Sequence, residues 1–267
     1  MSTDHPTGDA LLDALEAGEV RVAQRTEDGR WIVNAWIKEE ILRIFKSSPL
    51  VAFGNVNTRG LWPFVDKELL PPRQFRVADG VRLVPGGSAV RRGARLERGV
   101  ICMPPMYVNI GAFVGTGSLI DSHALVGSCA QIGERVHLSA AAQIGGVLEP
   151  MGARPVIVED DAFIGGNCGL YDGVLVRRRA VLAAGVVLTA STVVYDTVRK
   201  VELRGTRDEP LEIPEDAVVV PGSRPVTQRG AGDAWATQRN LHVACALIVK
   251  YRDARTDRAT ALEDALR

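Results

Sequence analysis

The residues whose types and spacing could do chemistry are an acid, a histidine and an arginine in the first half of the chain. Asp121 follows Ile120 at an outward place in a repeated pattern, so its carboxylate is displayed from a rigid wall. His123 comes two residues later, and a histidine close to a carboxylate is the arrangement of a general base oriented by an acid. Arg82 occupies a place that later repeats fill with small residues, and its guanidinium suits bidentate pairing with a carboxylate. These residues predict a site that binds an anionic substrate and moves a proton.

Each of these residues also has a structural interpretation. Aspartate is common in turns, so Asp121 could simply cap a corner. His123 could line the surface without taking part in chemistry, and Arg82 could pair with a carboxylate of the N-terminal segment. His137 precedes an inward leucine and is interpreted as a hydrogen-bonded structural histidine.

The elements that position these side chains are revealed by an aliphatic residue at every sixth position. The series runs from Val84 to Ile144 and again from Val158 to Val194, with Cys102 as its one non-aliphatic member. A period of six fits neither an α-helix nor an extended alternation, but it is typical of a solenoid of short strands and tight corners. Small side chains or valines mostly stand two residues before each aliphatic position. Glycine follows the aliphatic residue at several places, where we expect corners to need a backbone conformation that favours glycine: Gly115, Gly127, Gly133, Gly145 and Gly165.

The fold class predicted is mainly β, a parallel β-helix of hexapeptide repeats with a small helical N-terminal domain and a C-terminal cap. Three hexads per turn give about six coils, and a prism about 29 Å long at about 4.8 Å per coil. The expected domains are 1–80, with helices near 11–15 and 35–46; 81–198, the β-helix, with a loop insertion at 146–156; and 199–267. The last domain contains a strand at 218–220, an apolar run at 242–251 and a terminal helix at 258–267.

Composition narrows the class of protein. The 267 residues carry 32 basic and 32 acidic side chains, so no global positive field argues for nucleic acid or an anionic membrane. No apolar run approaches the length of a membrane span, and the four cysteines show no CxxC pairing. We expect a cytoplasmic protein in a reducing compartment, with no metal site.

Several segments resemble the tetrahydrodipicolinate N-succinyltransferases of the diaminopimelate route to lysine. The similarity covers roughly residues 80 to 255 and rests on the segments 106–113, 120–133, 136–139, 144–150, 158–165 and 248–250. It implies a left-handed coil and a homotrimer, with coenzyme A in grooves between subunits. In such a family Asp121 would bind the amino group of the acceptor and help catalysis, while Arg82 would grip an acceptor carboxylate.

The remaining site residues are expected from this resemblance and from the charges that the ligands carry. Glu149 is expected to contact the acceptor. Coenzyme A is expected at four positions, and the run Arg177–Arg179 is a further candidate for its phosphates. The four are Gly166, Ala184, Gly185 and Lys250.

One segment departs from the family. Many members carry a glutamate, a proposed catalytic partner, where this chain reads Gly166-Asn167-Cys168-Gly169. Gly169 cannot act as an acid or a base, so either a neighbour of Asp121 takes the role of the glutamate, which we favour, or the donor and acceptor differ from those of the family. The candidates are Glu149, His123, Tyr171 and Asp172.

The resemblance predicts a CoA-dependent N-acyltransferase that uses succinyl-CoA as co-substrate, binds no permanent cofactor, and acylates the amine of tetrahydrodipicolinate or its ring-opened form, 2-amino-6-oxopimelate. Acetyl-CoA with the same acceptor is the first alternative, as in the acetyl branch of the lysine route or a tabtoxin-type pathway. An inactive β-helix scaffold is the second. A γ-class carbonic anhydrase needs three histidines around zinc, whereas only His123 and His137 lie in the repeat region.

Overall fold

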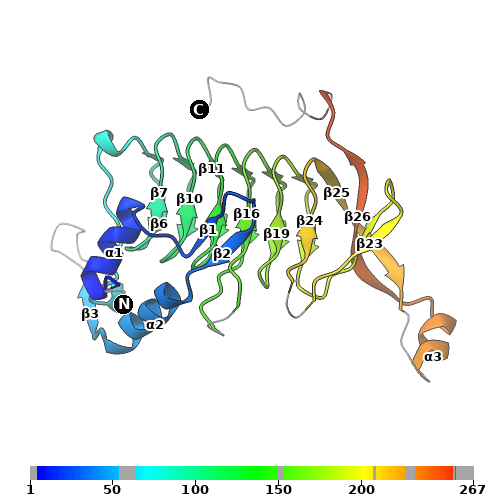
Figure 1. The fold of residues 1–267 in the computed structure, drawn as a ribbon, viewed down its shortest axis with the longest axis horizontal. Helices are drawn as coiled ribbons and strands as arrows, with labels where there is room; N and C mark the ends of the chain where they lie inside the picture. Colours follow the sequence, from blue (N-terminus) through cyan, green and yellow to red (C-terminus); the bar gives the residue numbers. More distant parts are fainter. Residues whose placement is uncertain are drawn as a thin grey trace.

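The computed structural model describes residues 5–53, 64–149, 153–206, 209–226, 232–254 and 256. A triangular prism of short parallel strands runs along the long axis of the molecule, with helices at its N-terminal end and a long strand pair at its C-terminal end (Figure 1). This is the parallel β-helix that the six-residue period predicts, of the left-handed kind that the family resemblance implies. The terminal helix expected at 258–267 lies outside the described residues. None of the described helices is long and apolar enough to cross a membrane.

Three sheets form the walls of the prism, and their strands follow one another in rotation along the chain. Sheet I contains β7 (Arg95–Leu96), β10 (Phe113–Val114), β13 (Gln131–Ile132), β16 (Ile157–Val158), β19 (Leu175–Val176) and β24 (Glu212–Ile213). The prism part of sheet II contains β5 (Arg82–Leu83), β8 (Ile101–Cys102), β11 (Leu119–Ile120), β14 (His137–Leu138), β17 (Phe163–Ile164), β20 (Val181–Leu182) and the start of β25 (Ala217–Pro225). Sheet III contains β6 (Ala89–Val90), β9 (Tyr107–Val108), β12 (Leu125–Val126), β15 (Gln143–Ile144), β18 (Gly169–Leu170) and β21 (Val187–Leu188).

The second residue of nearly every short prism strand is the predicted aliphatic position, and its side chain enters the shared core. In sheet III, for example, Val90, Val108, Val126 and Ile144 pair in sequence from coil to coil, and each is at most 1% exposed. Small residues two positions earlier, such as Ala124 and Ala142, are buried in the same core. The repeat therefore fixes which residues face inward.

The predicted series is wrong by one residue at its first member and leaves the three walls of the prism at its last. Leu83, not Val84, pairs with Cys102 and packs against the core, because the corner after β5 contains one residue more than the regular corners of the prism. Arg82 consequently pairs with Ile101 and points outward, so the small-residue place assigned to it belongs to Val81. At the other end, Val194 lies in β22 (Val194–Asp196), which pairs with no short strand of the prism, although its side chain is buried in the same core as predicted.

The last coil is completed after an excursion that the sequence pattern did not indicate. β22 and β23 (Val201–Leu203) form a hairpin, and the chain then returns to the prism at β24 and β25. Ile213 pairs with Val176 and Val219 with Leu182, so both occupy inward positions. The predicted strand at 218–220 is confirmed as part of β25, and the apolar run at 242–251 forms β26 (His242–Tyr251). These two strands pair with each other beyond the prism. A short helix, α3 (Gly232–Gln238), lies between them in sequence.

Glycines after the aliphatic positions are required by a close approach rather than by backbone conformation. Left-handed backbone occurs two residues later, for example at His123 and Asn167 with φ of 62° and 56°. At Gly127 a Cβ atom would lie 2.2 Å from the backbone nitrogen of Gly146, closer than any real contact. The predicted reason for these glycines was therefore wrong, although their place at the corners was correct.

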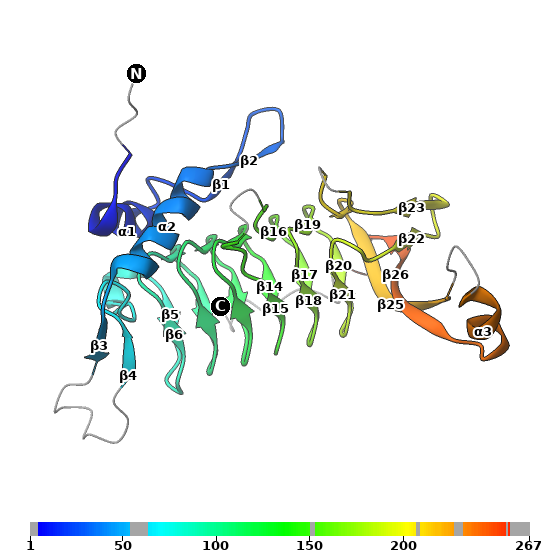
Figure 2. The same ribbon diagram turned by 90° about the horizontal axis from the view of Figure 1, so that it is seen from below.

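The N-terminal segment covers one edge and one wall of the prism. The two predicted helices are present as α1 (Gly8–Ala17) and α2 (Ala35–Ser47), and they bury Ile110 and Cys129 at the edge between sheets III and I. The segment also contains two hairpins that were not predicted: β1 (Ala23–Arg25) with β2 (Trp31–Val33), and β3 (Leu50–Phe53) with β4 (Phe64–Lys67). Figure 2 shows α2 and the β1–β2 hairpin running along the side of the prism, where Ala23 packs on Ile157 and Leu175 of sheet I.

Replacing Gly127 with alanine should destabilise the protein more than the same change at Gly99. Gly99 has φ of 78°, but its added Cβ would meet only ordinary contacts at 3.5 Å. Gly99→Ala should cost about 1–2 kcal/mol through backbone strain, whereas Gly127→Ala forces two coils apart. Thermal unfolding followed by circular dichroism should give a midpoint several degrees lower for Gly127→Ala. Equal midpoints would contradict the close-approach argument.

Candidate active site along one edge of the prism

The corners that join sheet II to sheet III are stacked in a column, which we call edge II–III. Backbone hydrogen bonds tie each corner to the next along this edge. The N–H groups of His123, Ala141, Asn167 and Gly185 donate to the carbonyls of Pro105, Ser122, Ala140 and Gly166, respectively. Most of the predicted catalytic and coenzyme-binding residues therefore lie on one rigid line, although they are up to 64 positions apart in sequence, from Asp121 to Gly185.

Asp121 is half-buried directly after β11, at the start of its corner. Its Oδ1 accepts a 2.7 Å hydrogen bond from the backbone N–H of Ser122. Within the described ranges, the carboxylate has no other hydrogen bond and no ion pair. The corner-capping interpretation is thus correct for one oxygen, while the other is available to a ligand.

His123 is exposed at the same corner, in the left-handed conformation. No hydrogen bond or ion pair joins its ring to Asp121 in the part of the chain that the structure describes. Its carbonyl accepts from Nε2 of Gln143 at 3.2 Å. The structure places the two predicted catalytic residues at one corner but does not form the acid–histidine pair that their spacing predicted.

Arg82 lies on the outer surface of sheet II, two coils before Asp121. It pairs with Ile101, which in turn pairs with Leu119, two residues before Asp121. Arg82 and Asp121 therefore share one wall of the prism, at about 10 Å along its axis for two coil spacings of about 4.8 Å.

Glu149 lies on a different edge from Asp121, because it follows β15 of sheet III at the start of the predicted insertion. It is exposed. The other end of the insertion is held by Lys38 of α2, whose fully buried Nζ donates to the carbonyl of Ala153 at 2.7 Å. Burial lowers the pKa of Lys38. Within one chain, Glu149 and Asp121 are not brought together.

Three of the four predicted coenzyme contacts lie on edge II–III. Gly166 is half-buried, and Ala184 and Gly185 are exposed one coil further on. Lys250 instead lies on β26, where it pairs with Val218 and forms a 3.4 Å ion pair with Asp253.

Tyr171 occupies the space over the glycine that replaces the family glutamate. A Cβ atom at Gly169 would lie 2.6 Å from Cε2 of Tyr171, and one at Gly145 would lie 2.7 Å from its Cδ1. Gly145 and Gly169 belong to neighbouring coils and have no side chains. The ring of Tyr171 therefore packs directly against their backbone. Tyr171 was among the candidates for the role of the missing acid, but its packing over Gly169 was not predicted. The sequence signal that could have predicted this packing is glycine at both positions 145 and 169, close to a tyrosine.

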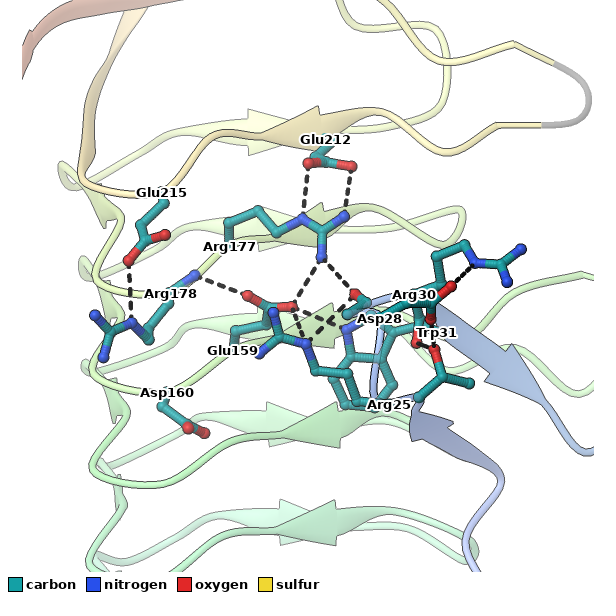
Figure 3. Close-up of polar contacts among 12 residues, drawn as sticks. Arg25, Asp28, Arg30, Trp31, Glu159, Asp160, Arg177, Arg178, Glu212 and Glu215 are labelled. Carbon is teal, nitrogen blue, oxygen red and sulfur yellow. Dashed lines mark hydrogen bonds and ion pairs between the residues drawn. The ribbon is translucent and has the colours of Figure 1, made fainter.

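The run Arg177–Arg179 lies on the edge between sheets I and II, away from the residues above, and its guanidinium groups are paired within the chain. Arg177 bonds both oxygens of Glu212 and reaches Glu159 at 3.0 Å (Figure 3). Arg178 and Arg179 pair with Glu215 and Asp216. The run is therefore a set of internal ion pairs, and the phosphate-binding prediction for it finds no support in this geometry.

Two family models match the chain. One, described as the tetrahydrodipicolinate N-succinyltransferase N-terminal region, covers residues 7–46, and one described as the hexapeptide repeat of succinyl-transferase covers residues 155–190.

Curated proteins extend this similarity over nearly the whole chain. A 2,3,4,5-tetrahydropyridine-2,6-dicarboxylate N-succinyltransferase of Nitrobacter winogradskyi is 43% identical over 261 residues, with 97% of this chain and 88% of the relative covered. The protein of the same name from Bradyrhizobium diazoefficiens is 42% identical over 266 residues, again with 97% and 88% covered. Among solved structures, a putative 2,3,4,5-tetrahydropyridine-2-carboxylate N-succinyltransferase of Campylobacter jejuni covers 90% of this chain and 61% of its own at 16% identity and a TM-score of 0.46.

Proposed function

The chain belongs to the tetrahydrodipicolinate N-succinyltransferase family, and we propose that it carries out the family's acyl transfer along edge II–III. It transfers a succinyl group to tetrahydrodipicolinate in the diaminopimelate route to lysine. The observation that supports the proposed location is the half-buried carboxylate of Asp121, held by one oxygen and available through the other, on the line that also contains Gly166 and Gly185.

The proposed co-substrate is succinyl-CoA, and the proposed acceptor form is the ring-opened 2-amino-6-oxopimelate. The free amine attacks the thioester carbonyl, so a C–N bond forms and the C–S bond breaks. The amine loses one proton to a base, and the leaving thiolate takes up a proton to become the thiol of coenzyme A. No covalent enzyme intermediate is needed, because holding both substrates on one rigid edge supplies a high effective concentration.

Asp121 is proposed to orient the amine and to accept its proton through Oδ2. The Ser122 N–H fixes the carboxylate plane, so the group is positioned before the substrate arrives. His123 at the same corner is proposed to line the site beside it and to relay the proton outward. Backbone N–H groups of the corners that do not tie one corner to the next are suited to hold the oxyanion of the tetrahedral intermediate.

Arg82 is proposed to bind a carboxylate of the acceptor from the same wall as Asp121. Gly166, Ala184 and Gly185 are proposed to contact coenzyme A, since small residues let an extended ligand approach the backbone closely. Lys250 stays a proposed phosphate contact at the C-terminal end of the prism, where its ion pair with Asp253 is exposed and so weak.

A homotrimer is proposed because the described chain leaves apolar side chains uncovered and separates two predicted site residues. Val187, Val243 and Val249 are exposed on sheet III and β26. In a trimer, Glu149 of one subunit can face Asp121 of its neighbour. Light scattering should give a mass near three times 28.7 kDa. A monodisperse monomer with full activity would contradict this assembly.

Replacing Asp121 with asparagine should lower turnover by about a hundredfold or more, because the proton acceptor is lost while volume is kept. Steady-state rates of thiol release measure this change, with circular dichroism to confirm the fold. His123→Asn is the informative partner variant, since asparagine accepts the left-handed backbone and removes only the imidazole. It should lower turnover less than Asp121→Asn. Unchanged turnover in Asp121→Asn would return that residue to a corner-capping role.

Purified protein given the acceptor with succinyl-CoA or acetyl-CoA should prefer succinyl-CoA by about tenfold or more in specificity constant. A site that pairs the succinyl carboxylate discriminates against a donor that leaves its polar groups unpaired. Thiol release with each donor gives the two constants. The opposite preference would favour the acetyl alternative that the Gly169 replacement raises, and no release with either donor would favour a scaffold.

A further inference from the structure

A cavity lies away from edge II–III, between the β1–β2 hairpin and the outer surface of sheet I, beside the edge between sheets I and II. Its volume is about 310 Å³, which suits a small metabolite. Twelve residues line it, and those used below are Arg21, Trp31, Glu97, Phe113, Glu134, Glu159 and Asp160. None of the residues placed on edge II–III is among them.

The guanidinium of Arg21 is held in a fixed orientation in the cavity. Its Nε donates to Oε1 of Gln131 at 3.1 Å, and its Cζ lies 3.5 Å from the centroid of the Phe113 ring. Gln131 is itself only 1% exposed, and its Nε2 is directed at the carbonyls of Gly111, Cys129 and Ala130, which fixes its oxygen toward Arg21.

The two terminal nitrogens of Arg21 have no hydrogen bond or ion pair within the described ranges. Burial lowers the pKa of this group to about 10, against the opposing effect of Glu97 and Asp160. A guanidinium that is removed from water and whose terminal nitrogens lack partners destabilises the folded chain unless an anion pairs with it.

The other acids on the cavity wall are already committed, with one exception. Glu97 bonds Arg95 through both oxygens, and Glu134 pairs with Arg135. Asp160 accepts a hydrogen bond from the backbone N–H of Glu134 at 2.8 Å, and it forms no ion pair with any described cation. In Figure 3 no dashed line reaches Asp160, in contrast to the neighbouring Glu159.

The β1–β2 hairpin, which covers the cavity, is held in place by hydrogen bonds to Glu159. Glu159 is 5% exposed and accepts hydrogen bonds from Trp31 of the hairpin, from Arg177 and from the backbone N–H of Arg178. Because these bonds tie β2 to sheet I, the space between Arg21 and Asp160 is held open rather than closed by collapse of the hairpin.

We propose that this cavity binds a small molecule with an α-amino acid group, whose carboxylate pairs with Arg21 and whose ammonium pairs with Asp160. One cation and one anion stay uncommitted here, and no ion pair within 4.0 Å joins them in the described chain, so a zwitterion can bridge them. The rings of Phe113 and Trp31 offer an apolar surface to the ligand side chain. The site is separate from the acyl-transfer edge, so its occupation does not depend on coenzyme A.

Isothermal titration calorimetry on the full chain tests the proposal with L-alanine, L-glutamate and L-lysine, which share the α-amino acid group and differ in side chain. At least one should bind with a dissociation constant of about 1 mM or lower, and Asp160→Asn and Arg21→Gln should each weaken it by about tenfold or more, as expected for loss of one charged hydrogen bond. Asp160→Asn keeps the shape of the side chain and can still accept from Glu134, so it serves even if Arg21→Gln is unstable.

The matched control is Asp161→Asn, which changes the neighbouring acid outside the cavity, where Asp161 pairs with Arg135. It should leave binding within about twofold, and Asp121→Asn should also bind normally. Propionate or ethylamine alone should bind far more weakly than L-alanine. The proposal is overturned if none of the three amino acids binds, if propionate binds as well as L-alanine, or if Asp160→Asn binds as tightly as the unaltered chain.

Discussion

Parallel pairing of each two-residue strand with its counterpart one coil later is the constraint on which the rest of this structure depends. It fixes the inward residue of each strand and aligns the outward residues in columns along each wall. Gln131, for instance, stands between Phe113 and Ile157 in such a column, and this is why one buried amide can orient Arg21 over the neighbouring ring. The corners are aligned in the same way, so a site built on them is rigid without any contribution from a large loop.

The three edges of the prism are used differently, and the N-terminal segment accounts for much of that difference. Helices α1 and α2 bury the edge between sheets III and I around Ile110 and Cys129. Ion pairs such as Arg135–Asp161 and Arg179–Asp216 occupy the edge between sheets I and II. The remaining edge carries Asp121 and the small corner residues. The proposed amino acid cavity exists only because the β1–β2 hairpin lies over sheet I, so it belongs to the contact between two parts of the chain and to neither alone.

The sequence predicts the inward half of this fold well, because burial selects the same residue types at every sixth position. The prediction fails at the two ends of the series, where the six-residue spacing changes. One extra residue after Leu83 misplaced Val84 and Arg82. The excursion before Ile213 concealed the final coil. Outward residues carry no such periodic signal, so the role expected for Asp121 rested on a family resemblance in addition to its outward position. Arg21 and Asp160 were missed, since nothing in their local sequence indicates that a hairpin brings them to one cavity. Gly127 was identified for the wrong reason, because a period in sequence does not distinguish a strained backbone from a crowded one.

The corners where the interval changes show how the length of such a chain can vary. Gln131 pairs with Ile157 as regularly as Phe113 pairs with Gln131, although the chain between Ile144 and Ile157 carries the long insertion. The strand pairs on both sides hold their register, so the greater length of this corner does not change how the coils pair. The strand pairing of the prism therefore does not set the length of this corner, and its described residues are constrained instead by contacts such as the hydrogen bond from Lys38 to Ala153.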